Sequence, residues 1–249
     1  MPNNKIQANF NAASRSYDGV ARVQRKAAGF LVKKLLKIRN FNPKTILDLG
    51  TGTGYIPELL IQIYPESFYY LNDIAGEMLE VCKLKFTGCP KVVYLHGDME
   101  KLNVDTFDVV ISNFALQWVD NLSKVLENFY AKSSEVFAFS TLVDGTFQEW
   151  EIILNQYQDI ALQKYPAAEE LINYCNALKD DHLFEYWVMD APLFFDHPLN
   201  FMRYLKLLGA SASKGKMGLN ALKALLNRRK KGLTVSYKIL FGIFKKIGK

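Results

Sequence analysis

A short apolar run is followed at once by three glycines at alternating positions. The run covers residues 45–49 (TILDL), and the glycines are Gly50, Gly52 and Gly54. A five-residue apolar segment that ends in a glycine-rich turn is typical of a buried strand in a parallel sheet. Glycines permit positive φ angles and let a ligand approach the backbone closely. The apolar run and the glycine-rich turn together therefore predict an α/β fold with a ligand site at the carboxyl end of the first strand.

Strand-like and helix-like segments alternate after this turn. The predicted strands are 45–49, 68–71, 92–95, 107–112 and 135–141, and the predicted helices are 55–64, 76–86 and 122–130. Such alternation predicts a doubly wound, mostly parallel sheet with right-handed crossovers. We assign residues 45–141 to this ligand-binding core.

The segments that flank the core have other patterns. Apolar residues at three- and four-residue spacing predict a helical lid over residues 8–40. Residues 147–231 are expected to form a cap or insertion. Within the cap we expect helices after 147 and at 198–208, a mixed aromatic part at 165–190, a short extended piece at 193–195 and a basic helix or loop at 219–231. Residues 233–244 alternate as in a strand that closes the sheet. The 249 residues are thus expected to form a single domain, 1–249.

Three carboxylates follow three successive predicted strands: Asp48, Asp73 and Asp98. The glycine-rich turn lacks the third glycine of a dinucleotide fingerprint, because position 55 is tyrosine, and it lacks the lysine of a phosphate-binding loop. Asp48 would repel a pyrophosphate but suits a cation such as an aminium or a sulfonium. Asp73 can accept both ribose hydroxyls, and Asp98 an adenine amino group. The pattern predicts a positively charged nucleoside without a phosphate.

Three runs of the sequence carry a family resemblance. ILDLGTGTGY, LNDIAGEMLE and HGDMEKL resemble the S-adenosylmethionine-binding motifs of class I methyltransferases. The resemblance implies a Rossmann-like class I methyltransferase fold, with S-adenosylmethionine as cofactor and S-adenosylhomocysteine as product. The implied cofactor-binding residues are Asp48, Gly50, Thr51, Gly52, Gly54, Asp73, Ile74, Asp98, Met99 and Asn113.

Further motifs resemble BioC-type malonyl-[acyl-carrier protein] O-methyltransferases. They are FDVVISNFALQW at 107–118, FNAASRSY at 10–17 with VQR at 23–25, and LKLLGA at 205–210 with Tyr237 and Phe241. The resemblance spans nearly the whole chain, although Ala75-Gly76 replaces a Ser-Pro pair that is more frequent in the family. It implies methylation of the free carboxylate of a malonyl group on acyl carrier protein. The methyl ester would then prime biotin synthesis.

Two other readings stay open. Some of these motifs are shared with methyltransferases of the trans-aconitate type, so the acceptor is alternatively a free small acid. A non-catalytic S-adenosylmethionine-binding module that docks an acidic partner is the third reading.

The expected reaction needs no general base, because a carboxylic acid is already ionised at pH 7. Catalysis then depends on alignment, exclusion of water and binding of the carboxylate. We predict that Tyr17 closes over cofactor and substrate, that Arg203 grips the carboxylate, and that Gln117 and Trp118 line the transfer site. Tyr17 and Trp118 are alternatively core anchors, and Arg203 a surface charge. No histidine or cysteine spacing is typical of a metal site, so no metal is expected.

Charge is distributed unevenly along the chain. Residues 1–196 hold all 25 acidic residues and 18 basic ones, whereas residues 197–249 hold 13 basic residues and no acidic one. The resemblance implies a partner for the basic C-terminal part of the chain, namely an acidic acyl carrier protein that carries malonyl-phosphopantetheine. The predicted partner-binding residues are Lys214, Lys216, Lys223, Arg228, Arg229, Lys230 and Lys231. A solvated basic face without a dedicated partner is the alternative.

Other partners and compartments are less consistent with the sequence. Residues 214–231 contain no aromatic side chain for base stacking, so we do not expect nucleic acid as partner. No apolar stretch approaches the roughly 18–20 residues of a membrane span, and residues 1–7 lack the apolar core of a secretory signal. A cytoplasmic protein is expected. The sequence leaves the oligomeric state open, with a monomer favoured.

Overall fold

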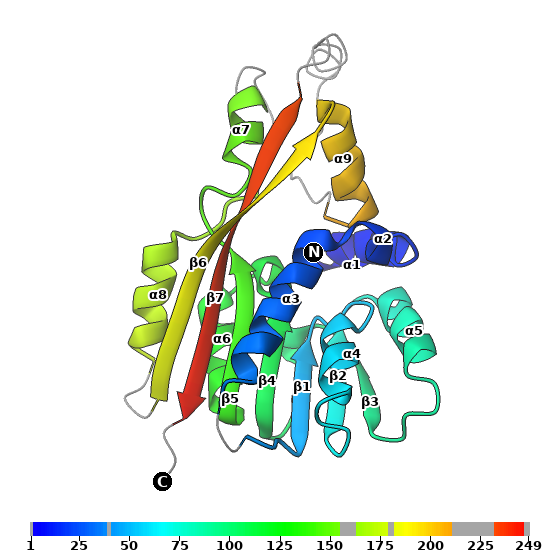
Figure 1. Cartoon of the computed structure of the whole chain (residues 1–249), viewed down its shortest axis with the longest axis vertical. Coiled ribbons are helices and arrows are strands. Elements are labelled where there is room, and N and C mark those ends of the chain that lie inside the picture. The colour runs from blue at the N-terminus through cyan, green and yellow to red at the C-terminus, as the bar shows by residue number, and fades with distance from the viewer. Residues whose placement is uncertain (1, 39–40, 155–162, 179–181, 211–231, 247–249) are drawn as a thin grey trace.

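The computed structural model describes residues 2–38, 41–154, 163–178, 182–210 and 232–246. Seven strands lie in these ranges: β1 (Thr45–Leu49), β2 (Phe68–Asp73), β3 (Val92–His96), β4 (Phe107–Asn113), β5 (Ser133–Leu142), β6 (His182–Phe195) and β7 (Leu233–Lys246). They form one sheet in the order β3-β2-β1-β4-β5-β7-β6 (Figure 1). β1 to β5 are parallel, and β7 runs antiparallel to both β5 and β6.

Helices cover both faces of the sheet. They are α1 (Pro2–Ala13), α2 (Tyr17–Val20), α3 (Arg22–Leu35), α4 (Tyr55–Ile61), α5 (Gly76–Lys85), α6 (Leu122–Ala131), α7 (Gln148–Leu154), α8 (Ala168–Asn176) and α9 (Pro198–Leu207), with two short 3₁₀ turns, η1 (Met99–Lys101) and η2 (Leu116–Trp118). Buried side chains of α3, α4 and α5 pack on one face, and those of α6 and α8 pack on the other. Because helices bury the sheet on both faces, the central strands are almost wholly apolar.

The antiparallel pair of β6 and β7 extends beyond the ends of the parallel strands, where α7 and α9 flank it (Figure 1). A third apolar cluster fills this extension and includes Trp150 of α7, Phe201 of α9 and Val235 of β7. The Phe201 ring packs edge-on against Trp150, with centroids 5.3 Å apart. The chain after β6 thus forms α9 at the carboxyl edge of the sheet, where α1 and α2 contact it.

The central predictions are confirmed. The structure has strands at all five predicted positions of the core, helices between them, and a closing strand that begins at Leu233. The mostly parallel, doubly wound sheet is also confirmed. The expected basic helix or loop at 219–231 lies outside the described residues.

One prediction of secondary structure is refined and another is wrong. The helical lid predicted over residues 8–40 is present, but breaks at residues 14–16 and at Ala21 divide it into α1, α2 and α3. The mixed part at 165–190 and the short piece at 193–195 contain α8 and the fourteen-residue strand β6. β6 was missed because it is an edge strand: its exposure follows no strict alternation, and it contains Pro192, which edge positions tolerate.

Candidate functional site

A cleft of about 670 Å³ lies at the carboxyl ends of β1, β2 and β4. We call it the main cleft. Its lining residues are Ile6, Phe10, Tyr17, Gly50, Gly52, Asn72, Asp73, Ile74, Met78, Gly97, Asp98, Met99, Glu100, Asn113, Phe114, Ala115, Trp118 and Val119. Parallel strands of a doubly wound sheet bind ligands at this edge, between strands whose crossovers diverge to opposite sides. The cleft therefore occupies the position that the glycine-rich turn predicted.

The glycine-rich turn forms the floor of the main cleft through two of its three glycines. Gly50 has φ +66° and lies so close to η2 that an added Cβ would stand 2.3 Å from the Cβ of Ala115. Gly52 has φ +57°, and a Cβ there would meet no atom within 4 Å. Gly50 is thus required by the fold, whereas the space above Gly52 is open to a ligand.

Asp73 is held rigidly at the end of β2. Its Oδ2 accepts a hydrogen bond from the backbone N–H of Gly52, and its Oδ1 accepts one from the N–H of Ala75, both at 2.8 Å. Each carboxylate oxygen keeps a further lone pair, as needed for two vicinal hydroxyls. Burial raises the pKa of Asp73 to about 6, although these two N–H groups oppose the shift.

Asp48 is buried at the end of β1 and faces a second cavity. Burial raises its pKa to about 7, the nearby Thr51 side chain opposes the shift, and the charge of Asp73 adds to it. Its Oδ2 and the Oγ1 of Thr51 are buried without a hydrogen-bond partner among the described residues. A nearby cation stabilises the ionised form of a buried acid. Asp48 therefore suits an aminium or sulfonium group.

This second cavity, the turn pocket, encloses about 400 Å³ beside the glycine-rich turn. Its lining residues are Tyr17, Asp18, Ala21, Gln24, Arg25, Asp48, Gly50, Thr51, Gly52, Thr53, Tyr55, Ile56 and Asn113. Asn113 borders both cavities and is fixed at two points. Its Nδ2 donates to the carbonyl of Gln24 at 3.1 Å, and its Oδ1 accepts from the Ser140 hydroxyl at 2.8 Å. It thereby ties the end of β4 to the first turn of α3.

The far end of the main cleft is formed by η1. Asp98 precedes η1 and accepts a hydrogen bond from the N–H of Glu100 at 3.0 Å. The Glu100 carboxylate in turn accepts from the N–H groups of Asp120 and Asn121, which anchors η1 to the loop before α6. Met99, Ile74 and Met78 add apolar surface to the cleft. An apolar slot with a fixed carboxylate at its end matches the shape and hydrogen bonding of an adenine ring.

A third cavity of about 420 Å³ lies between the sheet edge, the lid and α9. We call it the aromatic cavity. Its lining residues are Phe10, Tyr17, Gln24, Phe114, Gln117, Trp118, Leu142, Phe147, Tyr165, Leu205, Leu208, Ala210 and Tyr237. Tyr17 lines this cavity, the main cleft and the turn pocket, and it is the only one of the described residues that lines all three. The Tyr17 ring therefore stands where the three spaces meet.

Hydroxyl and amide groups supply the polarity of the aromatic cavity. The Tyr237 hydroxyl, which lines this cavity, donates to the oxygen of Tyr204 at 3.2 Å. Gln117 donates from Nε2 to the carbonyl of Phe114 at 2.8 Å, so its Oε1 points the other way. That Oε1 and the Oε1 of Gln24 are buried without a hydrogen-bond partner among the described residues. Burial keeps the pKa of Tyr17 and that of Tyr237 above their usual value, so both remain donors at neutral pH.

Contacts at three points hold the lid over these cavities. Gln7 of α1 donates to the carbonyl of Ile74 at 2.9 Å. Phe10 packs edge-on against Trp118, with centroids 5.5 Å apart. Asp18 of α2 accepts from the Thr53 hydroxyl at 2.6 Å. The lid thus contacts the β2, η2 and glycine-turn sides of the site.

Most of the predicted site residues come together here. Of the predicted cofactor-binding residues, all except Gly54 line the main cleft or the turn pocket. Gln117 and Trp118 line the aromatic cavity, as predicted for a transfer site. Gln24, which lines the turn pocket and the aromatic cavity, and Asn72, which lines the main cleft, were not predicted, although both lie within motifs that carry the family resemblance.

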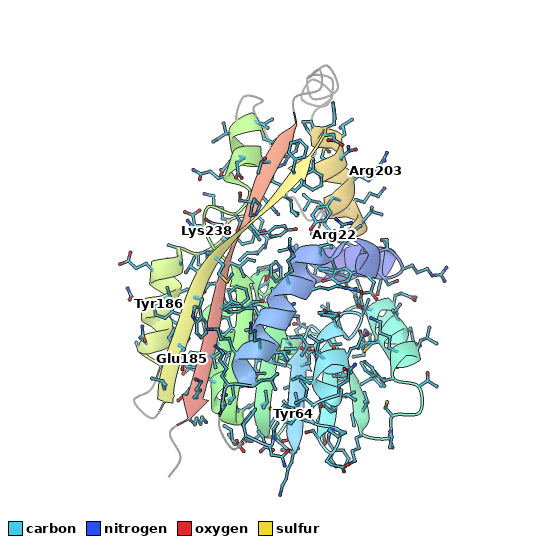
Figure 2. The ribbon with its side chains drawn as sticks, viewed as in Figure 1. Arg22, Tyr64, Glu185, Tyr186, Arg203 and Lys238 are labelled. Atoms are coloured by element: carbon cyan, nitrogen blue, oxygen red, sulfur yellow. The ribbon has the colours of Figure 1, made fainter. Side chains whose placement is uncertain are left out.

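Two predicted residues lie elsewhere. Gly54 caps α4 with φ +82°, and an added Cβ would stand 2.6 Å from Cys82 Sγ, so it serves core packing rather than a ligand. Arg203 is exposed on α9 and lines none of the three cavities (Figure 2). Phe201, Leu205 and Leu208 turn toward the protein, which leaves Arg203 on the opposite side of the helix. It is therefore not placed to grip a carboxylate.

The predicted partner-binding residues Lys214, Lys216, Lys223, Arg228, Arg229, Lys230 and Lys231 lie outside the described residues. Within the described ranges, no group of three or more His, Cys, Asp or Glu side chains is arranged to hold a metal ion. None of the helices in those ranges is long and apolar enough to cross a membrane.

Sequence comparison extends these observations. Residues 47–132 match the family described as "Methyltransferase domain". A malonyl-[acyl-carrier protein] O-methyltransferase of Neorickettsia risticii (strain Illinois) is 30% identical over 242 residues, which cover 97% of this chain and 96% of the relative. The protein of the same name from Bacillus cereus is 30% identical over 222 residues, covering 84% of this chain and 81% of the relative.

Structural comparison agrees at the level of the fold. The crystal structure of magnesium protoporphyrin IX methyltransferase (ChlM) from Synechocystis PCC 6803 with bound SAH superposes with a TM-score of 0.63. The alignment covers 99% of this chain and all of that chain at 12% identity. The chain therefore shares the Rossmann-like fold of class I methyltransferases.

Proposed function

Because this chain belongs to the malonyl-[acyl-carrier protein] O-methyltransferase family, we propose that it methylates the free carboxylate of a malonyl group carried by acyl carrier protein. The methyl donor in this proposal is S-adenosylmethionine. The observation that carries it is the position of Tyr17, where the main cleft, the turn pocket and the aromatic cavity meet. A donor bound in the first two spaces and an acceptor in the third would meet at this ring.

The residues of the main cleft and turn pocket fit the proposed donor. Asp73 offers two fixed oxygens to the ribose, and Asp98 with Met99 borders the slot for the adenine. Asp48, with its unpartnered oxygen, offers the methionine portion an anion. The open space above Gly52 leaves room for the part of the ligand that connects the ribose to the methionine portion. Thr51, Ile74 and Asn113 complete the walls.

The reaction requires little proton chemistry from the protein. When bound, S-adenosylmethionine supplies an electrophilic methyl group, which a carboxylate oxygen attacks in line as the sulfur–carbon bond breaks and its electron pair stays on sulfur. The acceptor is already ionised at neutral pH. What remains for the protein is to orient the carboxylate and exclude water, and the closed lid with its aromatic walls provides both.

A hydroxyl donor takes the role predicted for Arg203. The Tyr17 hydroxyl, on the ring that lines all three cavities, is the group suited to hold the malonyl carboxylate, since burial keeps this tyrosine protonated. The unpartnered Oε1 atoms of Gln24 and Gln117 are acceptors, so they suit the amide N–H groups of a pantetheine arm better than an anion. Trp118 forms a wall between donor and acceptor spaces.

In this proposal the methyl ester masks the malonyl charge and leads toward biotin. The protein would act as a single domain, residues 1–249, in the cytoplasm, as a monomer, and without nucleic acid as partner. Residues 214–231 would add positive charge toward the acidic carrier. A free small acid as acceptor is the second candidate, because the aromatic cavity also has the volume for one.

A methyl-transfer assay with labelled S-adenosylmethionine tests the proposal. The acceptors to compare are malonyl-acyl carrier protein, malonyl-coenzyme A and free malonate at equal concentrations. Labelling mainly of the carrier-bound malonyl group supports the proposal. Labelling of free malonate alone would move the function to a small-acid methyltransferase. Binding of S-adenosylhomocysteine without labelling of any acceptor would favour a non-catalytic binding module.

A further inference from the structure

Four exposed cations surround the contact between the lid and α9. They are Arg15 in the α1–α2 turn, Arg22 at the start of α3, and Arg203 and Lys206 on α9. We call them the junction cations. Arg203 and Lys206 are three residues apart, so they project from one side of α9. Figure 2 shows Arg203 on α9 and Arg22 at the start of α3 on the same side of the molecule.

A direct contact joins two of the segments that carry these cations. Ser16, next to Arg15, donates from its hydroxyl to the carbonyl of Leu207, next to Lys206, at 2.9 Å. The positive charge of Arg22 lowers the pKa of Tyr204, the neighbour of Arg203, against the larger effect of burial. The three segments thus meet at one junction, and their charges add to a single positive surface.

The junction cations have no carboxylate partner among the described residues. Residues 2–38 contain one acidic residue, Asp18, and residues 197–207 contain none. Asp18 is engaged elsewhere, since it forms ion pairs with Arg25 at 3.3 Å and with Lys85 at 2.8 Å. An uncompensated positive surface of this kind attracts an anionic partner over a distance of about one Debye length, roughly 8–10 Å.

The junction also borders the aromatic cavity. Leu205, Leu208 and Ala210, which line that cavity, lie on or just after α9, and Phe10 and Tyr17 line it from the lid. Gly209 has φ +73° and packs against Phe10, where an added Cβ would stand 2.9 Å from the ring. The same two segments therefore supply both the cavity wall and the junction cations.

We propose that the junction cations form the docking surface for the acidic face of acyl carrier protein around its prosthetic group. This inference rests on the proposed function and names the surface that delivers its substrate. The carrier would sit over the lid–α9 contact, with its arm directed into the aromatic cavity. Arg203 and Lys206 then act in association and not in the methyl transfer itself.

A binding titration tests the surface without requiring turnover. Fluorescently labelled malonyl-acyl carrier protein is titrated with the full chain saturated with S-adenosylhomocysteine, at low and at high salt. The variant Arg203→Glu/Lys206→Glu is expected to raise the Kd at low salt about tenfold, with a smaller difference at high salt. The matched control is Lys33→Glu/Lys37→Glu, which makes the same charge change at exposed positions toward and beyond the other end of α3.

Two outcomes overturn the docking surface. One is an unchanged Kd for the α9 variant, and the other is an equal loss in the control, which would indicate attraction by net charge alone. Thermal unfolding verifies that each variant is folded. Arg203→Gln/Lys206→Gln, which removes the charge without reversing it, is expected to give an intermediate Kd if the α9 variant proves unstable.

A kinetic comparison separates this inference from the proposed function. The ratio of kcat/KM for malonyl-acyl carrier protein to that for malonyl-pantetheine is expected to fall about tenfold in the α9 variant. An unchanged ratio counts against docking. A wild-type chain that binds the carrier at the junction but methylates no malonyl substrate would refute the proposed function and still support the docking surface.

Discussion

The backbone N–H of Gly52 donates a hydrogen bond of 2.8 Å to Oδ2 of Asp73. This bond joins the turn after β1 to the end of β2, so the two parts of the main cleft are held in one geometry before any ligand binds. Because Oδ1 is held in the same way by Ala75, the carboxylate has its orientation fixed at both oxygens. Preorganisation of this kind lowers the cost of ordering the site on binding.

The first prediction concerns this carboxylate. Asp73→Asn replaces one accepting oxygen by an NH₂ group, which then faces a backbone N–H donor. Loss of a charged hydrogen bond is worth about 1.5–3 kcal/mol, so the Kd for S-adenosylhomocysteine is expected to rise about 10- to 100-fold. Isothermal titration calorimetry measures it. The matched control is Asp105→Asn in the exposed loop before β4, and a similar loss there would contradict the role of Asp73.

The second prediction concerns pH. Burial raises the pKa of Asp48 to about 7 and that of Asp73 to about 6. The folded, cofactor-free protein thus binds these protons more tightly than the unfolded chain, so this contribution to stability is full below about pH 4 and is lost as the pH rises to about 7. A ligand that brings an aminium group to Asp48 and hydroxyl donors to Asp73 favours the ionised forms of both acids. Affinity for S-adenosylhomocysteine should therefore increase from about pH 5.5 to about pH 8.

Proton release measures the same coupling directly. Calorimetric titrations near pH 6.5 in buffers of different ionisation enthalpy are expected to show protons released on binding. Asp48→Asn removes the acid with the higher pKa and should reduce the number released. Proton uptake on binding, or an affinity that falls with rising pH, would contradict the assignment of a cation to this site.

The third prediction concerns Tyr17. Tyr17→Phe keeps the ring at the meeting point of the three cavities and removes only the hydroxyl. A lost hydrogen bond to a carboxylate is expected to lower kcat/KM for malonyl-acyl carrier protein about tenfold or more, while the affinity for S-adenosylhomocysteine changes little. Tyr186→Phe, at a tyrosine that is 48% exposed on β6, is the control. Equal activity of the wild type and Tyr17→Phe would contradict a role of the hydroxyl and would mean that Tyr17 contributes only through the packing of its ring.

The ligand-binding edge of the sheet was predictable because its signals are local. A buried strand must be apolar, a turn with positive φ favours glycine, and the acids follow their strands directly, so a few adjacent residues determine each feature. β6 was not predictable in this way, since an edge strand is neither uniformly buried nor alternating, and Pro192 within it argues for a break. The division of the lid into α1, α2 and α3 depends on contacts such as that of Ser16 with Leu207, 191 residues away.

The roles of individual side chains depended on tertiary orientation. Gly54 belongs to the same motif as Gly52, but only the structure shows that its Cα faces Cys82 and Phe86. Arg203 lies on α9, which borders the aromatic cavity, but its position around the helix axis directs its side chain away from that cavity. Gln24 and Tyr237 line the aromatic cavity from segments about 210 residues apart, so no spacing in the sequence relates them.

The last prediction separates a ligand role of Gly52 from its backbone role. Gly52 and Gly88 both have positive φ, +57° and +82°, and an added Cβ would meet no atom within 4 Å at either position. Gly52→Ala and Gly88→Ala should therefore destabilise the folded protein by similar amounts, about 1–2 kcal/mol each. Gly88 lines none of the three cavities, whereas Gly52 lines two. Only Gly52→Ala is expected to weaken S-adenosylhomocysteine binding, by about tenfold or more, because its methyl group occupies the space that the ligand needs. Thermal unfolding and calorimetry on the two variants give both quantities, and undiminished binding by a folded Gly52→Ala protein would mean that the ligand does not pass over this turn.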